Sequence, residues 1–327
     1  MSRPFRSRPR RWWLALGWLL ALLFAALLAP VLPLPYAPDT TDLTAIAEAP
    51  LTGSHWLGTD PLGRDLLAGL LFGARTALLV SLPAAALATL LGGLIGGIAG
   101  FWGNTGLRLP LSYAAAAAGT GLFLLGFHGS PTIVWAGASA VAAGLAGGVA
   151  LLGRRGYRRT VAVPFDALAL ALMALLASIP LLVLVLALAA LYPPSWPGLL
   201  AVLVLTYWPG PARLVRAEIL RIRALPYIES GWALGLPAVR ILWRHALPNC
   251  WHTLSATFPL SVATLIGLET TLSFLGVGLP PETASWGRLL AAARLAPTAW
   301  WLVLGPAAAI IGTTVALRQL AVREPAH

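Results

Sequence analysis

The side chains that most often carry out chemistry are sparse in this chain. Its 327 residues include five histidines and one cysteine, Cys250, and all 22 basic residues are arginine. The histidines form neither a His-Glu-x-x-His nor another metal-ligand spacing, and the sequence has no Gly-x-Ser-x-Gly elbow and no lysine for a Ser-Lys pair. A P-loop also needs a lysine to hold nucleotide phosphates. The residue types argue against an enzyme and place any ATP hydrolysis on a partner.

The most polar internal stretch lies between two apolar segments and spans residues 227–249. Glycine permits positive φ and proline cannot continue a helix. The stretch therefore predicts a short helix over 229–234, a break at 235–237 and a second helix over 239–247 that stops near Pro248. Two short helices at an angle form a knob that can enter a groove on a soluble protein; a solvated basic loop is the alternative. Its distinctive residues are Glu229, Ser230, Gly231, Gly235, His245, Leu247, Pro248 and Asn249.

A second polar cluster immediately precedes a long apolar run. The glycines and a proline in it predict a tight turn that carries three charged side chains. An internal Asp–Arg pair that holds the turn is one interpretation, and contact with an external partner or with the mouth of a pathway is the other. The cluster consists of Gly58, Thr59, Asp60, Gly63, Arg64 and Asp65.

A third candidate is Glu269, an acid inside an apolar run. An ionised carboxylate there costs several kcal/mol unless it faces a polar cavity or a partner. It therefore either lines a pathway or is a buried, hydrogen-bonded structural acid. Two further groups are expected to be structural: Asp166 as a cap at a helix start, and a charge cluster of Arg213, Arg216 and Glu218 at the membrane edge.

The composition indicates that membrane-spanning helices position these polar groups. Hydrophobic residues make up 58% of the chain, charged residues 10%, and the mean hydropathy is +0.82, whereas about a quarter of a soluble domain is charged. Apolar runs of 18 or more residues can cross a bilayer as helices. We therefore predict an all-α polytopic membrane protein with about 8 transmembrane helices. The predicted spans are Trp12–Ala29, Thr76–Trp102, Leu109–Phe127, Thr132–Leu152, Phe165–Leu191, Leu199–Val215, Leu254–Leu279 and Trp300–Leu317.

The placement of the arginines predicts the orientation. With the N-terminus inside, few arginines fall in external segments, as the positive-inside rule expects. This bias puts both termini and the 227–249 stretch in the cytosol, and it explains most of the net charge of +11 without nucleic acid. A cleaved signal peptide is the alternative for residues 12–29, but the run is long for one, so an uncleaved helix is favoured. The external arginines are Arg64, Arg75, Arg288 and Arg294.

The 227–249 stretch resembles the EAA loop of permease subunits of ABC (ATP-binding-cassette) importers. That loop reads Glu-Ala-Ala, three residues, Gly, nine residues, a hydrophobic position, one residue and Leu-Pro, and the peptide and nickel importers usually end it His-Ile-Leu-Pro-Asn. This chain has Glu229-Ser-Gly231 in place of Glu-Ala-Ala. The small residues keep close approach to an ATPase possible, while the glycine weakens the helix by about 1 kcal/mol relative to alanine.

Two further motifs resemble the DppC/OppC-type subunit of dipeptide and oligopeptide importers. Leu57-Gly-Thr-Asp-Pro-Leu-Gly-Arg-Asp65 is similar to its Leu-Gly-Thr-Asp-x-x-Gly-Arg-Asp signature, and the likeness resumes at Glu269-Thr-Thr-Leu-Ser-Phe-Leu-Gly and at Ser285-Trp-Gly287. The match covers roughly 54–104 and 162–318. It implies a six-helix permease core interrupted by an inserted hairpin at about 105–161, for which peripheral packing is the default interpretation.

The resemblance also implies a division of the chain. Residues 1–31 would form a cytosolic arm and the first helix, and 32–73 an external segment with the Gly-Thr-Asp motif. Residues 74–318 would form the permease domain, with its coupling loop at about 216–250, and 319–327 a cytosolic tail.

The implied function is a permease subunit of an ATP-driven importer in the bacterial inner (plasma) membrane, with short peptides as substrate. Its implied partners are ABC ATPase subunits, a second homologous permease, an extracytoplasmic substrate-binding protein and the lipid bilayer. The chain would bind no cofactor or metal, because the ATP and Mg are used by the ATPases. Import of nickel or another small solute is the alternative, and a secondary transporter or a membrane enzyme is less favoured. Recovery of an ATPase partner would discriminate between them.

Overall fold

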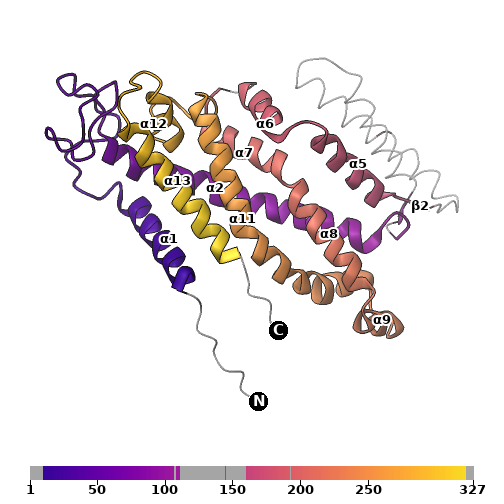
Figure 1. Cartoon of the computed structure of the whole chain (residues 1–327). Coiled ribbons are helices and arrows are strands. Elements are labelled where there is room, and N and C mark those ends of the chain that lie inside the picture. The colour runs from indigo at the N-terminus through magenta and orange to yellow at the C-terminus, as the bar shows by residue number, and fades with distance from the viewer. Residues whose placement is uncertain (1–9, 107, 111–143, 145–159, 192, 322–327) are drawn as a thin grey trace.

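The computed structural model describes residues 10–106, 108–110, 144, 160–191 and 193–321, which form a bundle of helices with one short sheet (Figure 1). The elements, in chain order, are α1 (Arg10–Leu28), α2 (Leu66–Trp102), β1 (Arg108–Pro110), β2 (Thr160–Ala162), α5 (Phe165–Ala177), α6 (Leu181–Ala190), α7 (Trp196–Tyr207), α8 (Pro209–Arg223), α9 (Pro226–Ala233), α10 (Ala238–Ile241), the π-helical turn η1 (Leu242–Ala246), α11 (Leu247–Phe274), α12 (Trp286–Ala292) and α13 (Trp301–Ala321).

Within these described ranges, four helical segments are long and apolar enough to cross a membrane: α1, α2, the combined α7–α8 segment Trp196–Arg223, and α13. The bent pair α5 and α6 makes a fifth if it is counted as one span. The helix α11 has 28 residues but does not belong to this set, because polar side chains are spread along its whole length. The predicted spans at 109–127 and 132–152 lie almost wholly outside the described residues.

Helix α2 is the centre of the bundle and contacts α1, α5, α7, α8, α11, α12 and α13. Its backbone approaches α8 closely at a stripe of glycines spaced four residues apart, Gly92, Gly96 and Gly100. A Cβ atom added at Gly96 would lie 2.2 Å from the carbonyl oxygen of Ala212 in α8. Small residues in such a stripe allow two helices to pack backbone against backbone, so this stripe fixes α8 relative to the rest of the bundle.

The span predicted over Phe165–Leu191 is not a straight helix. The chain bends by 84° between α5 and α6, which have 13 and 10 residues. The bend lies at Pro180, which lacks a backbone N–H and disfavours helical backbone in the residue before it. Apolar periodicity alone therefore overestimated the length of this element.

Two other boundaries differ from the predictions. Helix α2 begins at Leu66 rather than at Thr76, because Asp65 accepts a hydrogen bond from the Ala68 N–H and caps it. Helix α12 was not predicted, because seven residues are too few for a clear apolar period. The strands β1 and β2 pair antiparallel, with Leu109 opposite Val161, and join the two ends of the segment interpreted as an insertion.

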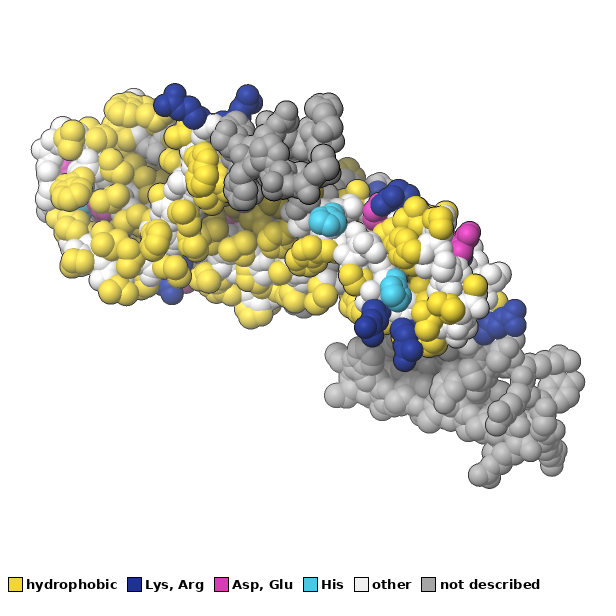
Figure 2. All heavy atoms as spheres, turned by 90° about the horizontal axis from the view of Figure 1, so that it is seen from below, with side chains coloured by type: hydrophobic (Ala, Val, Ile, Leu, Met, Phe, Trp, Pro, Cys, Tyr) yellow, Lys and Arg dark blue, Asp and Glu magenta, His cyan; other side chains and the backbone are white. Residues whose placement is uncertain are grey.

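The polar segments lie at opposite ends of the bundle (Figure 1). The 30–65 segment and α12 lie at one end, while α9 lies at the other, toward which the described start of α1 and end of α13 also point. In Figure 2 the visible face is mostly hydrophobic along the bundle, and arginine and histidine side chains gather at the end that carries α8 and α9.

Candidate functional site

Helix α9 is a short helix whose two ends are fixed by local chemistry. Leu225 precedes it in extended backbone and Pro226 occupies its first turn, where a missing N–H costs nothing. At its other end Gly235 has φ +72° and donates its N–H to the Trp232 carbonyl oxygen at 3.0 Å, while Leu236 N–H reaches the Gly231 carbonyl oxygen at 3.1 Å. This is a Schellman motif, so Gly235 is the residue that ends the helix.

The second helix of the predicted knob does not stop near Pro248. After Pro237, α10 continues through the π-helical turn η1 directly into α11, and Pro248 lies in the first turn of α11. A π-helical turn pairs each N–H with a carbonyl five residues earlier. It therefore shifts the register of the backbone hydrogen bonds just before Pro248, which has no N–H to donate. The knob is therefore rigidly joined to the long helix α11.

We call residues 226–249 the α9 knob, and a dedicated apolar cluster anchors it. Ile228 of α9 and Ile241 of α10 are buried with Phe101 of α2 and with Val215, Ile219 and Ile222 of α8. The ring of Phe101 stacks on Trp232, and the Asn249 amide donates to the Tyr227 hydroxyl at 3.0 Å and to the His245 carbonyl oxygen at 2.7 Å. Motion of the knob must therefore be shared by α2, α8 and α11.

The outer face of the α9 knob combines apolar and charged side chains. Leu234 is 79% exposed, Trp232 47% and Trp243 54%. Glu229 and Ser230 are also exposed, His245 is half-buried, and Glu229 forms no ion pair with any described residue. The exposed or half-exposed large side chains of this face are Tyr227, Trp232, Leu234, Val239, Arg240, Trp243 and Arg244. Exposed apolar groups mixed with charges are typical of a protein–protein contact.

The glycine at position 231 leads to a stability prediction. An added Cβ there would meet Ile241 at 3.5 Å and Leu236 at 3.8 Å, which are ordinary contacts. Gly231→Ala should therefore stabilise α9 by about 1 kcal/mol through helix propensity alone. Hydrogen exchange of the α9 amides should slow in this variant relative to the wild type. Faster exchange would show that alanine destabilises α9 at this position, although the packing leaves room for its Cβ.

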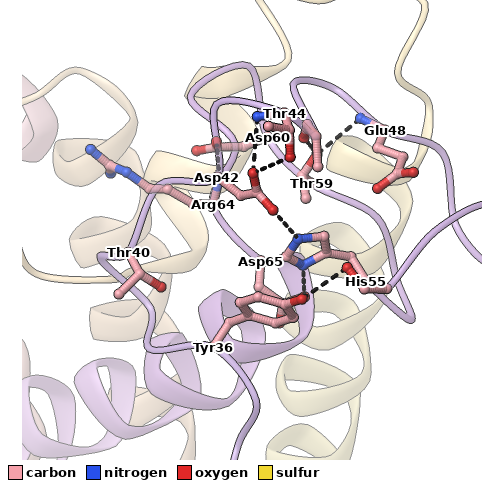
Figure 3. A network of polar contacts seen from close by, with 12 residues as sticks. Tyr36, Thr40, Asp42, Thr44, Glu48, His55, Thr59, Asp60, Arg64 and Asp65 are labelled. Carbon is pink, nitrogen blue, oxygen red and sulfur yellow. Dashed lines mark hydrogen bonds and ion pairs between the residues drawn. The ribbon is translucent and has the colours of Figure 1, made fainter.

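The second polar cluster folds into a compact network before α2 (Figure 3). Gly58 and Gly63 both have positive φ, and a Cβ at Gly63 would lie 2.1 Å from the Asp42 carbonyl oxygen. The buried Thr59 hydroxyl donates to the Ala45 carbonyl oxygen and accepts from the Glu48 N–H at 2.9 Å. The motif residues therefore build the turn and tie it to the preceding segment.

The predicted Asp–Arg pair does not hold this turn. One carboxylate oxygen of Asp60 accepts the backbone N–H groups of Leu62 and Arg64, both at 2.8 Å. The Arg64 side chain instead points away from the network (Figure 3). An aspartate that bonds to the backbone two residues ahead forms an Asx-turn, and this arrangement fixes the loop without an arginine.

His55 is a buried residue of this network that the sequence did not indicate as a site residue. Its Nδ1 donates to Asp65 at 2.9 Å, its Nε2 lies 3.8 Å from Asp42, and its ring packs on Tyr36 with centroids 4.0 Å apart. Hydrogen bonds from the Thr44 hydroxyl and N–H hold the pKa of Asp42 below its ordinary value. Asp65 thus serves both the cap of α2 and the imidazole.

Removal of the Asp65 carboxylate should lower the free energy of unfolding in two ways. Asp65→Ala deletes the N-cap of α2, worth about 1 kcal/mol, and leaves the buried His55 N–H unpaired, which costs about 1–3 kcal/mol. We expect the purified protein to unfold at a clearly lower temperature in detergent. Asp39→Ala is the matched control, because Asp39 is an exposed acid of the same segment. Equal melting of the two variants would contradict the assigned role.

Glu269 lies in α11 and is completely buried. One carboxylate oxygen accepts the Ser273 hydroxyl at 2.8 Å, and the other lies 3.5 Å from the Thr270 hydroxyl. Among the described residues it forms no ion pair. This is the geometry expected of a buried, hydrogen-bonded structural acid, and the adjacent Thr270 lies against Gly287 of α12.

The Ser285-Trp-Gly287 motif seats α12 against the bundle. Ser285 caps α12 by accepting the Arg288 N–H at 3.3 Å, and the buried Trp286 donates its indole N–H to the Leu70 carbonyl oxygen at 3.0 Å. A Cβ at Gly287 would lie 2.1 Å from the Thr270 carbonyl oxygen. The serine of the motif therefore caps α12, and the tryptophan and glycine pack it against the bundle.

The predicted cluster of Arg213, Arg216 and Glu218 does not form. Arg216 makes a two-point ion pair with Asp166 of α5, at 2.5 and 2.7 Å, while Glu218 pairs with Arg221 at 2.6 Å. Arg213 donates to a backbone carbonyl of α5 at 2.9 Å. Helix positions two residues apart point to different sides, so Arg216 and Glu218 find separate partners, and Asp166 ties α5 to α8.

Comparison with known proteins gives a consistent result. Residues 159–322 match the family model described as binding-protein-dependent transport system inner membrane component. A putative peptide permease protein of Brucella suis biovar 1 is 32% identical over 273 residues, which cover 84% of this chain and 70% of the relative. A putative peptide transport system permease protein of the same organism is 30% identical over 96% of this chain and 85% of its own length. The oligopeptide transport system permease protein OppC of Bacillus subtilis is 27% identical over 82% and 68%.

Proposed function

Because the chain belongs to the family of inner membrane components of binding-protein-dependent transport systems, we propose that it is a permease subunit of an ATP-driven importer of short peptides. Peptides are the cargo in the names of the relatives, including one aligned over 96% of this chain. The chain itself would supply the path and no ATPase site. Two ATPase subunits would use the ATP and Mg.

The observation that carries the proposal is the α9 knob. It exposes apolar and charged side chains at one end of the bundle, and its buried residues are shared with α2, α8 and α11. A protein pressed against this face would therefore move helices that run through the bundle. In the proposed cycle, closure of the ATPases on ATP shifts the knob, and the helices switch the path between its two openings.

The proposed orientation places the α9 knob and both termini in the cytosol. The arginine bias supports it, and the described ends of α1 and α13 point toward the side of the bundle that carries α9 (Figure 1). The 30–65 segment, with Asp60, Arg64 and Asp65, and the helix α12 would then face outward. A substrate-binding protein would dock at that end.

A second, homologous permease would complete the path. The bundle leaves many large apolar side chains exposed on α1, α2, α5 and α13, and in a bilayer these would face lipid or the second permease. Glu269, buried and hydrogen bonded within the single chain, would support the path through the seat of α12 rather than by direct contact with cargo.

The test is purification of the tagged protein from its native membrane in a mild detergent, followed by mass spectrometry of the proteins that accompany it. We expect ATPases with Walker motifs and a second, related permease. A known importer carried through the same detergent is the control. Recovery of the chain alone, while the control importer stays assembled, would overturn the proposal.

A further inference from the structure

A pocket of about 510 Å³ lies between the 38–65 segment, the start of α2 and the region of α12. Three arginines line it, Arg64 from the turn before α2, Arg288 from α12 and Arg294 just beyond α12. These are three of the four arginines that the sequence places outside. Their convergence on one cavity was not visible in the sequence, because Arg64 and Arg288 are more than two hundred positions apart.

The Arg64 guanidinium has no carboxylate partner among the described residues. The nearest acids in the chain are already engaged: Asp60 bonds to backbone N–H groups, and Asp65 bonds to Ala68 and His55. The Nε atom of Arg64 is buried and has no hydrogen-bond partner in the part of the chain that the structure describes. A buried polar atom without a partner needs an explanation, and a ligand in the pocket supplies one.

Arg288 is held by hydrogen bonds to two backbone carbonyls, but it forms no ion pair with a residue that the structure describes. Its two terminal nitrogens donate to the carbonyl oxygens of Thr283 and Leu279 at 2.8 and 2.7 Å. Burial, and then the charge of Arg64, lower the pKa of Arg288, and the smaller opposing effects of Glu282 and Glu269 do not cancel them. Two guanidinium groups that repel one another across a partly buried pocket are stabilised by an anion between them, and a planar carboxylate suits the guanidinium fork.

A carboxylate of the chain itself completes the pattern at the rim. Glu282 lines the same pocket and is exposed. It forms no ion pair within the described residues. The pocket therefore combines the guanidinium groups of Arg64 and Arg288 with the carboxylate of Glu282, and this set complements a small molecule with a carboxylate at one end and an ammonium group at the other.

We propose that this pocket binds the free carboxylate of a short peptide, held by Arg64 and Arg288, with Glu282 facing the peptide's ammonium group. The volume lies within the range of about 300–1,000 Å³ found for small-molecule sites. The inference rests on the proposed function and adds to it a contact between this chain and its cargo at the entrance of the path.

Direct binding tests the proposal. Trialanine and trialanine amide, which lacks the terminal carboxylate, are titrated calorimetrically into the purified complex without the substrate-binding protein. We expect the amide to bind at least tenfold more weakly, because a charge-assisted hydrogen bond corresponds to roughly a 10–100-fold change in affinity. Arg64→Gln should weaken trialanine binding by a similar factor and leave the amide nearly unchanged, and Arg64→Lys should fall between Arg64→Gln and the wild type.

Arg75→Gln is the matched control, because Arg75 lies in the helix α2 that follows Arg64 and does not line the pocket. Equal binding of trialanine and its amide, absence of trialanine binding, or equal losses in Arg64→Gln and Arg75→Gln would each overturn the proposal. If Arg64→Gln weakened the affinity for the substrate-binding protein alone, the pocket would serve docking and the cargo site would be wrong. ATP-driven uptake by the wild type, measured in parallel, separates failure of this site from failure of the importer function.

Discussion

Glu229→Arg in the α9 knob is expected to abolish peptide uptake while the associated ATPases continue to hydrolyse ATP. Glu229 is exposed, lies in the first turn of α9 and forms no ion pair within the described chain. Its carboxylate is therefore available to a partner, and reversal of its charge would place like charges or an unpaired arginine in the contact. Such changes cost several kcal/mol, so the affinity of this contact should fall on the order of a hundredfold or more and uptake should be lost.

The measurement compares uptake and ATP hydrolysis in proteoliposomes that contain the whole complex. Glu229→Asp is the control, since it keeps the negative charge at the same exposed position. Gly235→Val should produce the same uncoupling by a different cause, because φ +72° strains a β-branched residue and breaks the Schellman motif. Normal uptake in Glu229→Arg and Gly235→Val would remove the knob from the mechanism.

Gly96→Ala is expected to destabilise the bundle more than any other single methyl added to α2. The new Cβ would lie 2.2 Å from the Ala212 carbonyl oxygen and 2.9 Å from its carbon, both backbone atoms of α8. Neither can move without separating α2 from α8, so the cost should reach about 1–3 kcal/mol or more. The effect extends to the α9 knob, because α8 leads directly into it. Size-exclusion chromatography after heating gives the midpoint of unfolding.

Gly93→Ala on the same helix is the control for that variant. The nearest atom to its added Cβ is a Leu254 methyl at 3.9 Å, and alanine favours helix over glycine by about 1 kcal/mol. Gly93→Ala should therefore melt at the same temperature as the wild type or slightly higher. Melting of the two variants at one temperature would show that α2 and α8 do not pack as closely as described.

The sequence predicted those parts of the fold that depend on local signals. The helix ended by Gly235, the break at Pro237 and the long apolar helices follow from residues close to one another in the chain. The predicted helix boundaries were wrong at prolines, because a proline can either interrupt a helix or occupy its first turn. The chain bends by 84° at Pro180, whereas Pro248 lies in the first turn of α11 and does not interrupt the helix. The difference depends on the preceding π-helical turn, which no local pattern predicts.

The candidate sites divide in the same way. The sequence singled out the residues of the Gly-Thr-Asp motif, but it did not predict their contacts. Asp65 bonds to His55 and Ala68, while the Arg64 side chain points away from the other motif residues. The convergence of Arg64 with Arg288 depends on how α12 packs on α2 through Trp286 and on α11 through Gly287. Such long-range contacts arise from the tertiary packing of small and large side chains and have no signature in the spacing of either segment.

The central claim is that an ATPase binds the α9 knob, and site-specific crosslinking tests it most directly. A photoreactive phenylalanine derivative would replace Trp232, which is 47% exposed on the knob, and in a second variant Trp56, which is 68% exposed at the opposite end. Illumination of native membranes should crosslink an ATPase with Walker motifs to position 232 and not to position 56. An ATPase present in the membrane but absent from the product at position 232, or equally crosslinked at both positions, would contradict the claim.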